Sequence, residues 1–234
     1  MTQLLERKPG IFQSGATTHV QAEQARRLLN VIVASVGLVL TAPLMLLVAV
    51  LVKLDSPGPA IFTQPRVGLD RRDRRDRSSR ASRRSEDKGG RIFTIYKFRT
   101  MTCAPPGEDA QCWAAENDPR VTRVGRILRA TRLDELPQLL NVVKGDMNIV
   151  GPRPEQPQIF AELRAEVTDY RERQRVLPGI TGWAQVNQGY DSSIDDVKKK
   201  VELDLEYIGE RSPGKDLVIM AKTMPVMVLR KGSR

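Results

Sequence analysis

Two adjacent carboxylates, Asp134 and Glu135, are the residues of this sequence best suited to chemistry. They precede an apolar pattern of helical spacing that begins at Leu136 and stops at Gly145. An acid at the start of a helix lies near the positive end of the helix dipole, beside free backbone N–H groups. That position stabilises an ionised carboxylate and also favours a bound phosphate. A plain helix cap uses the same residue types, so both interpretations are open at this point.

Three basic residues are candidates for holding phosphate beside these acids. Lys97 and Arg99 lie in an alternating stretch at 91–101, RIFTIYKFRTM, and so fall on one face of a predicted strand. Two cations on one face can grip a diphosphate, and a solvent-facing pair is the alternative. Arg153 stands between two prolines in the GPRP turn at 151–154, where a rigid backbone suits a phosphate clamp.

Several kinds of site are excluded by composition. The single histidine, His19, lies in a polar N-terminal stretch, which excludes a Ser-His-Asp triad and a histidine-based zinc site. Neither a GxxxxGK[ST] loop nor a GxGxxG fingerprint occurs. The two cysteines, Cys103 and Cys112, are too few for a disulfide scaffold and suit a reducing compartment. An enzyme of this composition works with carboxylates, Lys, Arg and Tyr, and any metal would be a hard cation such as Mg²⁺.

One uncharged run at 28–52 is long enough to cross a bilayer of about 30 Å as a helix. Pro43 lies inside it, where proline bends or breaks a helix. Arg26 and Arg27 precede the run and Lys53 follows it, and cationic flanks prefer the cytoplasmic side. Two topologies fit equally: a kinked spanning helix, or a re-entrant helix that breaks at Pro43 and returns to the same face.

The chain of 234 residues carries a net charge of +10, so its partner is expected to be anionic. We expect a polar tail at 1–27, a membrane-embedded segment at 28–57 and a catalytic domain at 58–230. Within that domain, 71–91 holds ten basic and four acidic residues and reads as a disordered insert. It would suit anionic lipid headgroups or remain a solvated loop, and nucleic acid is not expected because no aromatic residue is interleaved for stacking.

The other elements are short. The stretch at 60–63 fits either a short strand or an interfacial contact, and a strand is predicted at 91–101. A helix is predicted to open at 117–119 and run to the two acids, with Val121, Val124, Ile127 and Leu128 facing inward. We further expect a helix at 155–177, a tight loop at 178–183 displaying Trp183, a helix at 193–208 and an amphipathic helix at 217–229 that suits either the membrane interface or the core. The fold class is therefore α+β and predominantly helical.

Four stretches together resemble a known family: IFTQPRVG at 61–68, IFTIYKFRTM at 92–101, LDELPQLLNVVKGDMNIVGPRP at 133–154 and LPGITGWAQVN at 177–187. The family is that of the bacterial sugar transferases, the small monotopic phosphoglycosyl transferases that begin glycan assembly on polyprenol phosphate. The resemblance covers about 27–229 without the insert. Ala42 departs from the family, which often has Ser before the breaking proline, and Thr41 next to it can replace that hydroxyl.

The resemblance implies a helix-break-helix at Pro43 that dips into one leaflet of the membrane. The basic remainder of the chain is expected on the cytoplasmic face of the inner membrane in either topology, because cationic residues prefer that side. The resemblance implies that Asp134 is the nucleophile and a ligand of Mg²⁺, and that Glu135 completes a catalytic dyad. It also implies a UDP-sugar as donor and undecaprenyl phosphate as acceptor.

On this hypothesis Asp134 attacks the β-phosphate, UMP leaves, and the lipid phosphate then takes the sugar phosphate from Asp134. Glu135 assists in metal or proton handling, while Lys97, Arg99 and Arg153 bind phosphate. The competing hypotheses are direct transfer without a covalent intermediate, a non-catalytic scaffold of a glycan-export complex, and a membrane-tethered nucleic-acid binder that uses 71–91. The sequence is compatible with several sugars and with a homodimer.

Overall fold

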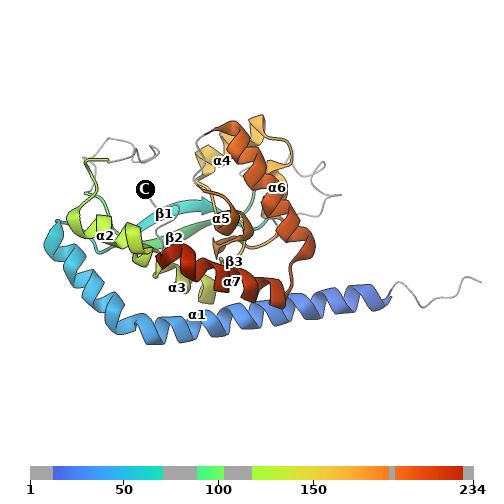
Figure 1. The fold of residues 1–234 in the computed structure, drawn as a ribbon, viewed down its shortest axis with the longest axis horizontal. Helices are drawn as coiled ribbons and strands as arrows, with labels where there is room; N and C mark the ends of the chain where they lie inside the picture. Colours follow the sequence, from blue (N-terminus) through green and yellow to red (C-terminus); the bar gives the residue numbers. More distant parts are fainter. Residues whose placement is uncertain (1–12, 71–88, 103–117, 190–192, 229–234) are drawn as a thin grey trace, which may run out of the picture.

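The computed structural model describes residues 13–70, 89–102, 118–189 and 193–228. A single long helix, α1 (Gln13–Asp55), runs along one edge of the molecule, and all other described elements lie on one side of it (Figure 1). Both cysteines and the segment 71–88 of the basic insert lie outside the described residues. The described part is mostly helical with a few short strands, which confirms the α+β class.

Helix α1 is continuous over 43 residues and contains Pro43. We expected a polar tail up to residue 27, whereas the helix already begins at Gln13. The helix is not interrupted at Pro43, and it curves along its length so that its C-terminal part rises toward helix α2 (Arg123–Thr131) (Figure 1). The Thr41 hydroxyl donates to the carbonyl of Gly37 at 2.7 Å, which is a bond back onto the preceding turn of the helix.

The surface of α1 is unusually apolar. It is the one helix of the described residues that is long and apolar enough to cross a membrane. Large exposed side chains cover it, among them Leu28, Val39, Leu40, Leu46 and Leu54. An apolar surface of this extent is stable against lipid rather than water, so α1 associates with the membrane.

A two-stranded antiparallel sheet lies above α1. Strand β1 (Ile61–Val67) pairs with β2 (Ile92–Phe98), from Ile61 opposite Phe98 to Val67 opposite Ile92. Helix α3 (Gln138–Lys144) lies along the other edge of β2. The Asn141 side chain holds it there: its Nδ2 donates to Thr94 O at 2.7 Å, and its Oδ1 accepts from Tyr96 N at 3.1 Å. The strand predicted at 91–101 is confirmed, as is the strand alternative at 60–63, and β1 extends four residues beyond Thr63.

Helix α2 (Arg123–Thr131) begins later than predicted. Thr122 caps it by accepting a hydrogen bond from Gly125 N at 2.9 Å, whereas Val121 pairs with Met101 in a β-bridge, so the predicted start at 117–119 is wrong. A side chain at Gly125 would collide with the Thr100 carbonyl, which explains the glycine at this close approach. Ile127 is 64% exposed, contrary to its predicted inward position.

We call all described elements other than α1 the body of the protein. The part of the body that follows α3 consists of short helices and strands. The predicted helix at 155–177 is wrong as one element: it divides into α4 (Pro157–Glu166) and the 3₁₀ segment η3 (Tyr170–Arg175), because the backbone turns left-handed at Asp169 with φ 60°. The predicted loop at 178–183 contains a strand, and Trp183 begins a short helix.

The helix predicted at 193–208 is confirmed, with a capping box between Ser193 and Asp196. The remaining elements are β3 (Asn148–Val150), β4 (Gly179–Thr181), α5 (Trp183–Asn187), α6 (Ile194–Glu210) and α7 (Pro213–Val228).

Both ends of the apolar run of α1 are attached to this same body. Near its start, buried Arg26 binds Asp216 of α7 at 3.1 Å and donates to the Tyr207 hydroxyl of α6 at 2.6 Å. Near its end, Val48 and Val52 pack in one core cluster with Phe98 and Leu128. The contacts therefore hold α1 against the body at two points that lie on either side of Pro43.

Candidate active site

The two acids lie in a 3₁₀ turn, η2 (Leu133–Glu135), between α2 and α3. Arg132 ends α2 in a left-handed conformation with φ 58°, and Pro137 immediately precedes α3 without a side-chain capping bond. Each acid is only 7% exposed. The acids thus precede the helix, as expected, but the tight turn directs both of them into the protein instead of placing them within the first turn of α3.

Glu135 is the centre of a cluster of cations. Its Oε1 accepts from Lys97 Nζ at 2.9 Å and from Arg153 Nη2 at 2.8 Å, and Arg132 Nη1 lies 3.9 Å away. Burial raises the pKa of Glu135, but Arg153, Lys97 and Arg132 outweigh burial and hold that pKa far below its usual range. Glu135 is therefore ionised at neutral pH and fixes the two nearest cations in place.

Asp134 has a different environment. Its Oδ1 is buried and has no hydrogen-bond partner within the described part of the chain. Burial raises the pKa of this carboxyl, the positive charge of Lys97 opposes that shift, and the negative charge of Glu135 adds to it. An oxygen without a partner among nearby cations is free to accept a metal ion or to attack an electrophile.

Lys97 and Arg153 reach this cluster from distant parts of the chain. Glu135 raises the pKa of Arg153, while burial lowers the pKa of Lys97 against the opposing effect of Glu135. Arg99, expected on the same face as Lys97, lies elsewhere. Strand β2 ends at Phe98, and Arg99 is turned to the end of α1, where Nη2 donates to Ser56 O at 2.6 Å and to Val52 O at 3.2 Å.

A second group of charged side chains adjoins the GPRP turn, and the sequence analysis missed it. Its members are Glu155, Arg173, Lys200 and Asp204. Glu155 Oε1 binds Lys200 Nζ at 2.9 Å and lies 3.9 Å from Arg173 Nη1. Arg173 Nε in turn donates to Asp204 Oδ2 at 2.7 Å, with both side chains buried. Local patterns gave no signal for this group, since its members lie on separate elements and are brought together only by the fold.

The Glu155 carboxylate should stabilise the protein in a pH-dependent way. Burial raises its pKa, but Lys200 and Arg173 outweigh burial and lower it from 4.5 to about 2. A depressed pKa adds stability above pH 4.5, and that stability is lost as the pH falls toward 2. We expect Glu155→Gln to lower the free energy of unfolding by up to about 3 kcal/mol at neutral pH, since one pKa unit corresponds to about 1.4 kcal/mol.

Thermal unfolding in detergent at several pH values measures this effect. The melting temperatures of wild type and Glu155→Gln should differ at pH 7 and converge as the pH approaches 2. Glu202→Gln, an exposed acid of α6, is the matched control and should leave the curve unchanged. A constant difference between wild type and Glu155→Gln at all pH values would contradict the proposed origin of the stability.

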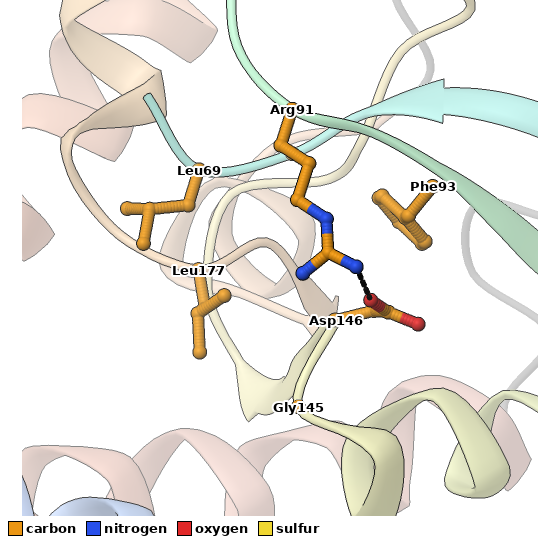
Figure 2. A pocket seen from close by; sticks show the side chains of 7 residues that line it. Leu69, Arg91, Phe93, Gly145, Asp146 and Leu177 are labelled. Atoms are coloured by element: carbon orange, nitrogen blue, oxygen red, sulfur yellow. Dashed lines mark ion pairs between the residues drawn. The ribbon is translucent and has the colours of Figure 1, made fainter. Parts of the chain in front are cut away.

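One small cavity of the described structure lacks the room for a substrate. It lies beside the Arg91–Asp146 ion pair of 3.8 Å and is lined also by Leu69, Phe93 and Leu177 (Figure 2). Its volume of about 10 Å³ suffices for about one water molecule. The acids of η2 do not line it.

The model of the family described as bacterial sugar transferase matches residues 21–230. The chain belongs to the bacterial sugar transferase family. Its match covers the membrane helix, η2 and the GPRP turn, and it confirms the resemblance stated from the four sequence stretches. The two acids of η2, Asp134 and Glu135, thus lie within the part of the chain that matches the family.

Three relatives show what the chain is similar to. It is 42% identical over 209 residues to the Aeromonas hydrophila UDP-N-acetylgalactosamine-undecaprenyl-phosphate N-acetylgalactosaminephosphotransferase, covering 89% of this chain and 45% of the relative. It is 40% identical over 229 residues to a Caulobacter vibrioides UDP-glucose:undecaprenyl-phosphate glucose-1-phosphate transferase, covering 97% and 77%. An Escherichia coli protein of the latter name is 39% identical over 201 residues, covering 85% and 39%. The family member thus spans less than half of the first and third relatives.

Proposed function

We propose that this family member transfers a sugar 1-phosphate from a UDP-sugar to undecaprenyl phosphate and releases UMP, as the first membrane step in building a polysaccharide. The observation that carries the proposal is the buried Asp134 Oδ1, which has no hydrogen-bond partner among the described residues and adjoins the Lys97–Glu135–Arg153 cluster. The names of the three relatives support the reaction class. They differ in the sugar, glucose or N-acetylgalactosamine, so the proposal leaves the sugar open.

The first step is an attack by Asp134 on the β-phosphorus of the donor. A new bond forms between the carboxylate oxygen and phosphorus, and the bond from that phosphorus to the oxygen bridging to the α-phosphate breaks. UMP leaves with the bonding electrons, and the sugar phosphate remains on Asp134. Burial without a hydrogen-bond partner leaves the attacking oxygen free of a hydrogen bond that would have to be broken.

In the second step a phosphate oxygen of the lipid attacks the same phosphorus and displaces Asp134. Lys97 and Arg153 have donors besides those bound to Glu135, and they stabilise the negative charge that spreads over the transferring group. Glu135 holds both cations at the site. Its low pKa favours a role in orienting charge over a role as a proton donor.

Mg²⁺ is compatible with these residues. No group of three or more His, Cys, Asp or Glu side chains gathers in the described ranges, but Mg²⁺ is commonly held by one or two carboxylates together with substrate phosphates. Asp134 would be the protein ligand, since its Oδ1 has no partner there. When bound, the ion would neutralise phosphate oxygens and so favour attack by an anion.

The contacts of α1 favour the re-entrant topology over a spanning one. Arg26 at one end and Val52 at the other both pack on the body that carries η2, so both ends lie on its side of the membrane. We assign 28–57 to the membrane and 58–230 to a catalytic domain on the cytoplasmic face of the inner membrane. Helices α2, α3 and α7, which contact α1, expose Ile127, Leu140 and Leu217 and would lie at the interface.

Cysteine labelling tests this topology. We expect Gln24→Cys and Pro59→Cys, each placed singly in a Cys103→Ser/Cys112→Ser background, to react with a membrane-impermeant maleimide in inverted membrane vesicles. Neither should react in right-side-out vesicles, because both ends of α1 face the cytoplasm. Labelling of the two positions from opposite sides would establish a spanning helix instead.

Release of UMP from a panel of UDP-sugars tests the function. Membrane-embedded protein should release about one equivalent of UMP without lipid acceptor and gain the mass of a sugar phosphate. The donor that gives this burst identifies the sugar. Absence of turnover with every donor in the presence of undecaprenyl phosphate would argue for a non-catalytic scaffold.

A further inference from the structure

The GPRP turn that carries Arg153 is held along its whole backbone. Each carbonyl group from residue 152 to 155 accepts a hydrogen bond, and the donors come from three elements of the fold, namely β1, η3 and β4. The four bonds are Gly179 N to Pro152 O at 2.9 Å, Arg173 Nη2 to Arg153 O at 3.1 Å, Arg66 Nη1 to Pro154 O at 3.1 Å and Val67 N to Glu155 O at 2.9 Å.

Of the four donors, Arg173 is the one that binds the carbonyl of Arg153. Its side chain is fully buried in η3, and its Nε is fixed by Asp204 of α6 at 2.7 Å while its Nη2 reaches the Arg153 carbonyl. A planar guanidinium can serve two acceptors at a set angle, whereas an ammonium group cannot reproduce that fork. The pair thus connects α6 to the backbone of the turn.

We propose that Arg173 and Asp204 are positioning residues that set where the Arg153 guanidinium meets Glu135 and the substrate phosphate. Prolines on both sides of Arg153 restrict the backbone, so the direction of its side chain follows the orientation of the turn. A misplacement of about 1 Å in a positioned group can lower a rate about 100-fold. This inference deepens the proposed function and rests on it for its kinetic part.

The test removes the pair as a unit. Arg173→Met/Asp204→Leu replaces two buried charges by apolar side chains, which generally preserves folding, whereas removal of one partner leaves an uncompensated charge. Glu155, which lies 3.9 Å from Arg173, keeps Lys200 at 2.9 Å as its partner. Lys198→Gln/Asp195→Asn is the control, because it removes a 2.8 Å ion pair from the exposed face of the same helix. Thermal unfolding verifies that both variants are folded.

Kinetics in two backgrounds separate positioning from general damage. With Arg153 present, the Arg173→Met/Asp204→Leu variant should lose about 10- to 30-fold in kcat/KM for UMP release. In an Arg153→Ala background the same change should cost less than about 2-fold, since the group that it positions is absent. The control should be neutral in both. An equal loss in both backgrounds would overturn the proposal.

Hydrogen exchange provides a measurement that needs no activity. Amides of the segment 151–156 should exchange at least about 10-fold faster in Arg173→Met/Asp204→Leu and at the wild-type rate in the control. Unchanged exchange in this segment would overturn the positioning role. If wild type releases no UMP, the proposed function fails, and the exchange rates still decide whether the pair holds the turn.

Discussion

Replacement of Asp134 by asparagine is expected to abolish release of UMP, with a loss of at least about 10³-fold, and to prevent formation of the sugar-phosphate adduct. An amide cannot form the acyl phosphate bond, and loss of a nucleophile typically removes most of the rate enhancement. The protein should remain folded. Burial raises the pKa of Asp134, so its charge opposes folding, and asparagine removes that charge without breaking a hydrogen bond to Oδ1.

Three measurements on one preparation check this result: UMP release, intact mass, and melting temperature in detergent. The melting temperature should equal or exceed that of wild type. Asp146→Asn is the control, since Asp146 follows α3 and is bound to Arg91 away from η2. UMP release by Asp134→Asn that requires lipid would contradict the covalent scheme and favour direct transfer.

Glu135→Gln is expected to impair both stability and activity. The substitution keeps the size of the side chain but removes the charge that Lys97 and Arg153 share at 2.9 and 2.8 Å. Breaking a buried ion pair destabilises a protein by about 3–5 kcal/mol. For a chain of this size, at about 2–4 °C for each kcal/mol, we expect a melting temperature lower by about 6–20 °C. The two released cations lose their fixed positions, so kcat should fall about 100-fold or more.

Glu135→Asp distinguishes charge from geometry. It keeps the carboxylate but shortens the side chain by one methylene, so we expect most of the stability to return and the activity to stay low. Binding of UDP to Glu135→Gln, measured by calorimetry, should not weaken, because Lys97 and Arg153 become available to phosphate. Wild-type melting and turnover in Glu135→Gln would show that Glu135 does not organise the site.

The features that the sequence by itself determined are those set by neighbours along the chain. The apolar run at 28–52 gave the membrane helix, and the alternation of Ile92, Thr94 and Tyr96 gave β2. Gly145 ends α3 with φ 89°, a conformation that glycine adopts freely, as its place after Lys144 predicted. The order LDELP fixed the place of the acids directly before a helix.

Features that depend on distant segments could not be obtained in this way. Lys97 and Arg99 differ by only two positions, yet one binds Glu135 and the other binds the end of α1, because β2 ends between them. The helix expected at 155–177 ends at Glu166, although its charge pattern continues. A periodic pattern records local preference, whereas the end of an element depends on what it packs against.

The sequence alone therefore determined the family, the place of two adjacent acids before a helix and the long apolar helix. Only the tertiary structure decided which cations surround Glu135, which residues hold the Arg153 turn and which body receives both ends of α1. The physical reason is the distance along the chain over which each kind of interaction acts. Capping, alternation and apolar runs act over a few residues, whereas Lys97, Glu135 and Arg153 meet only after the sheet register and the left-handed turn at Arg132 have placed their backbones.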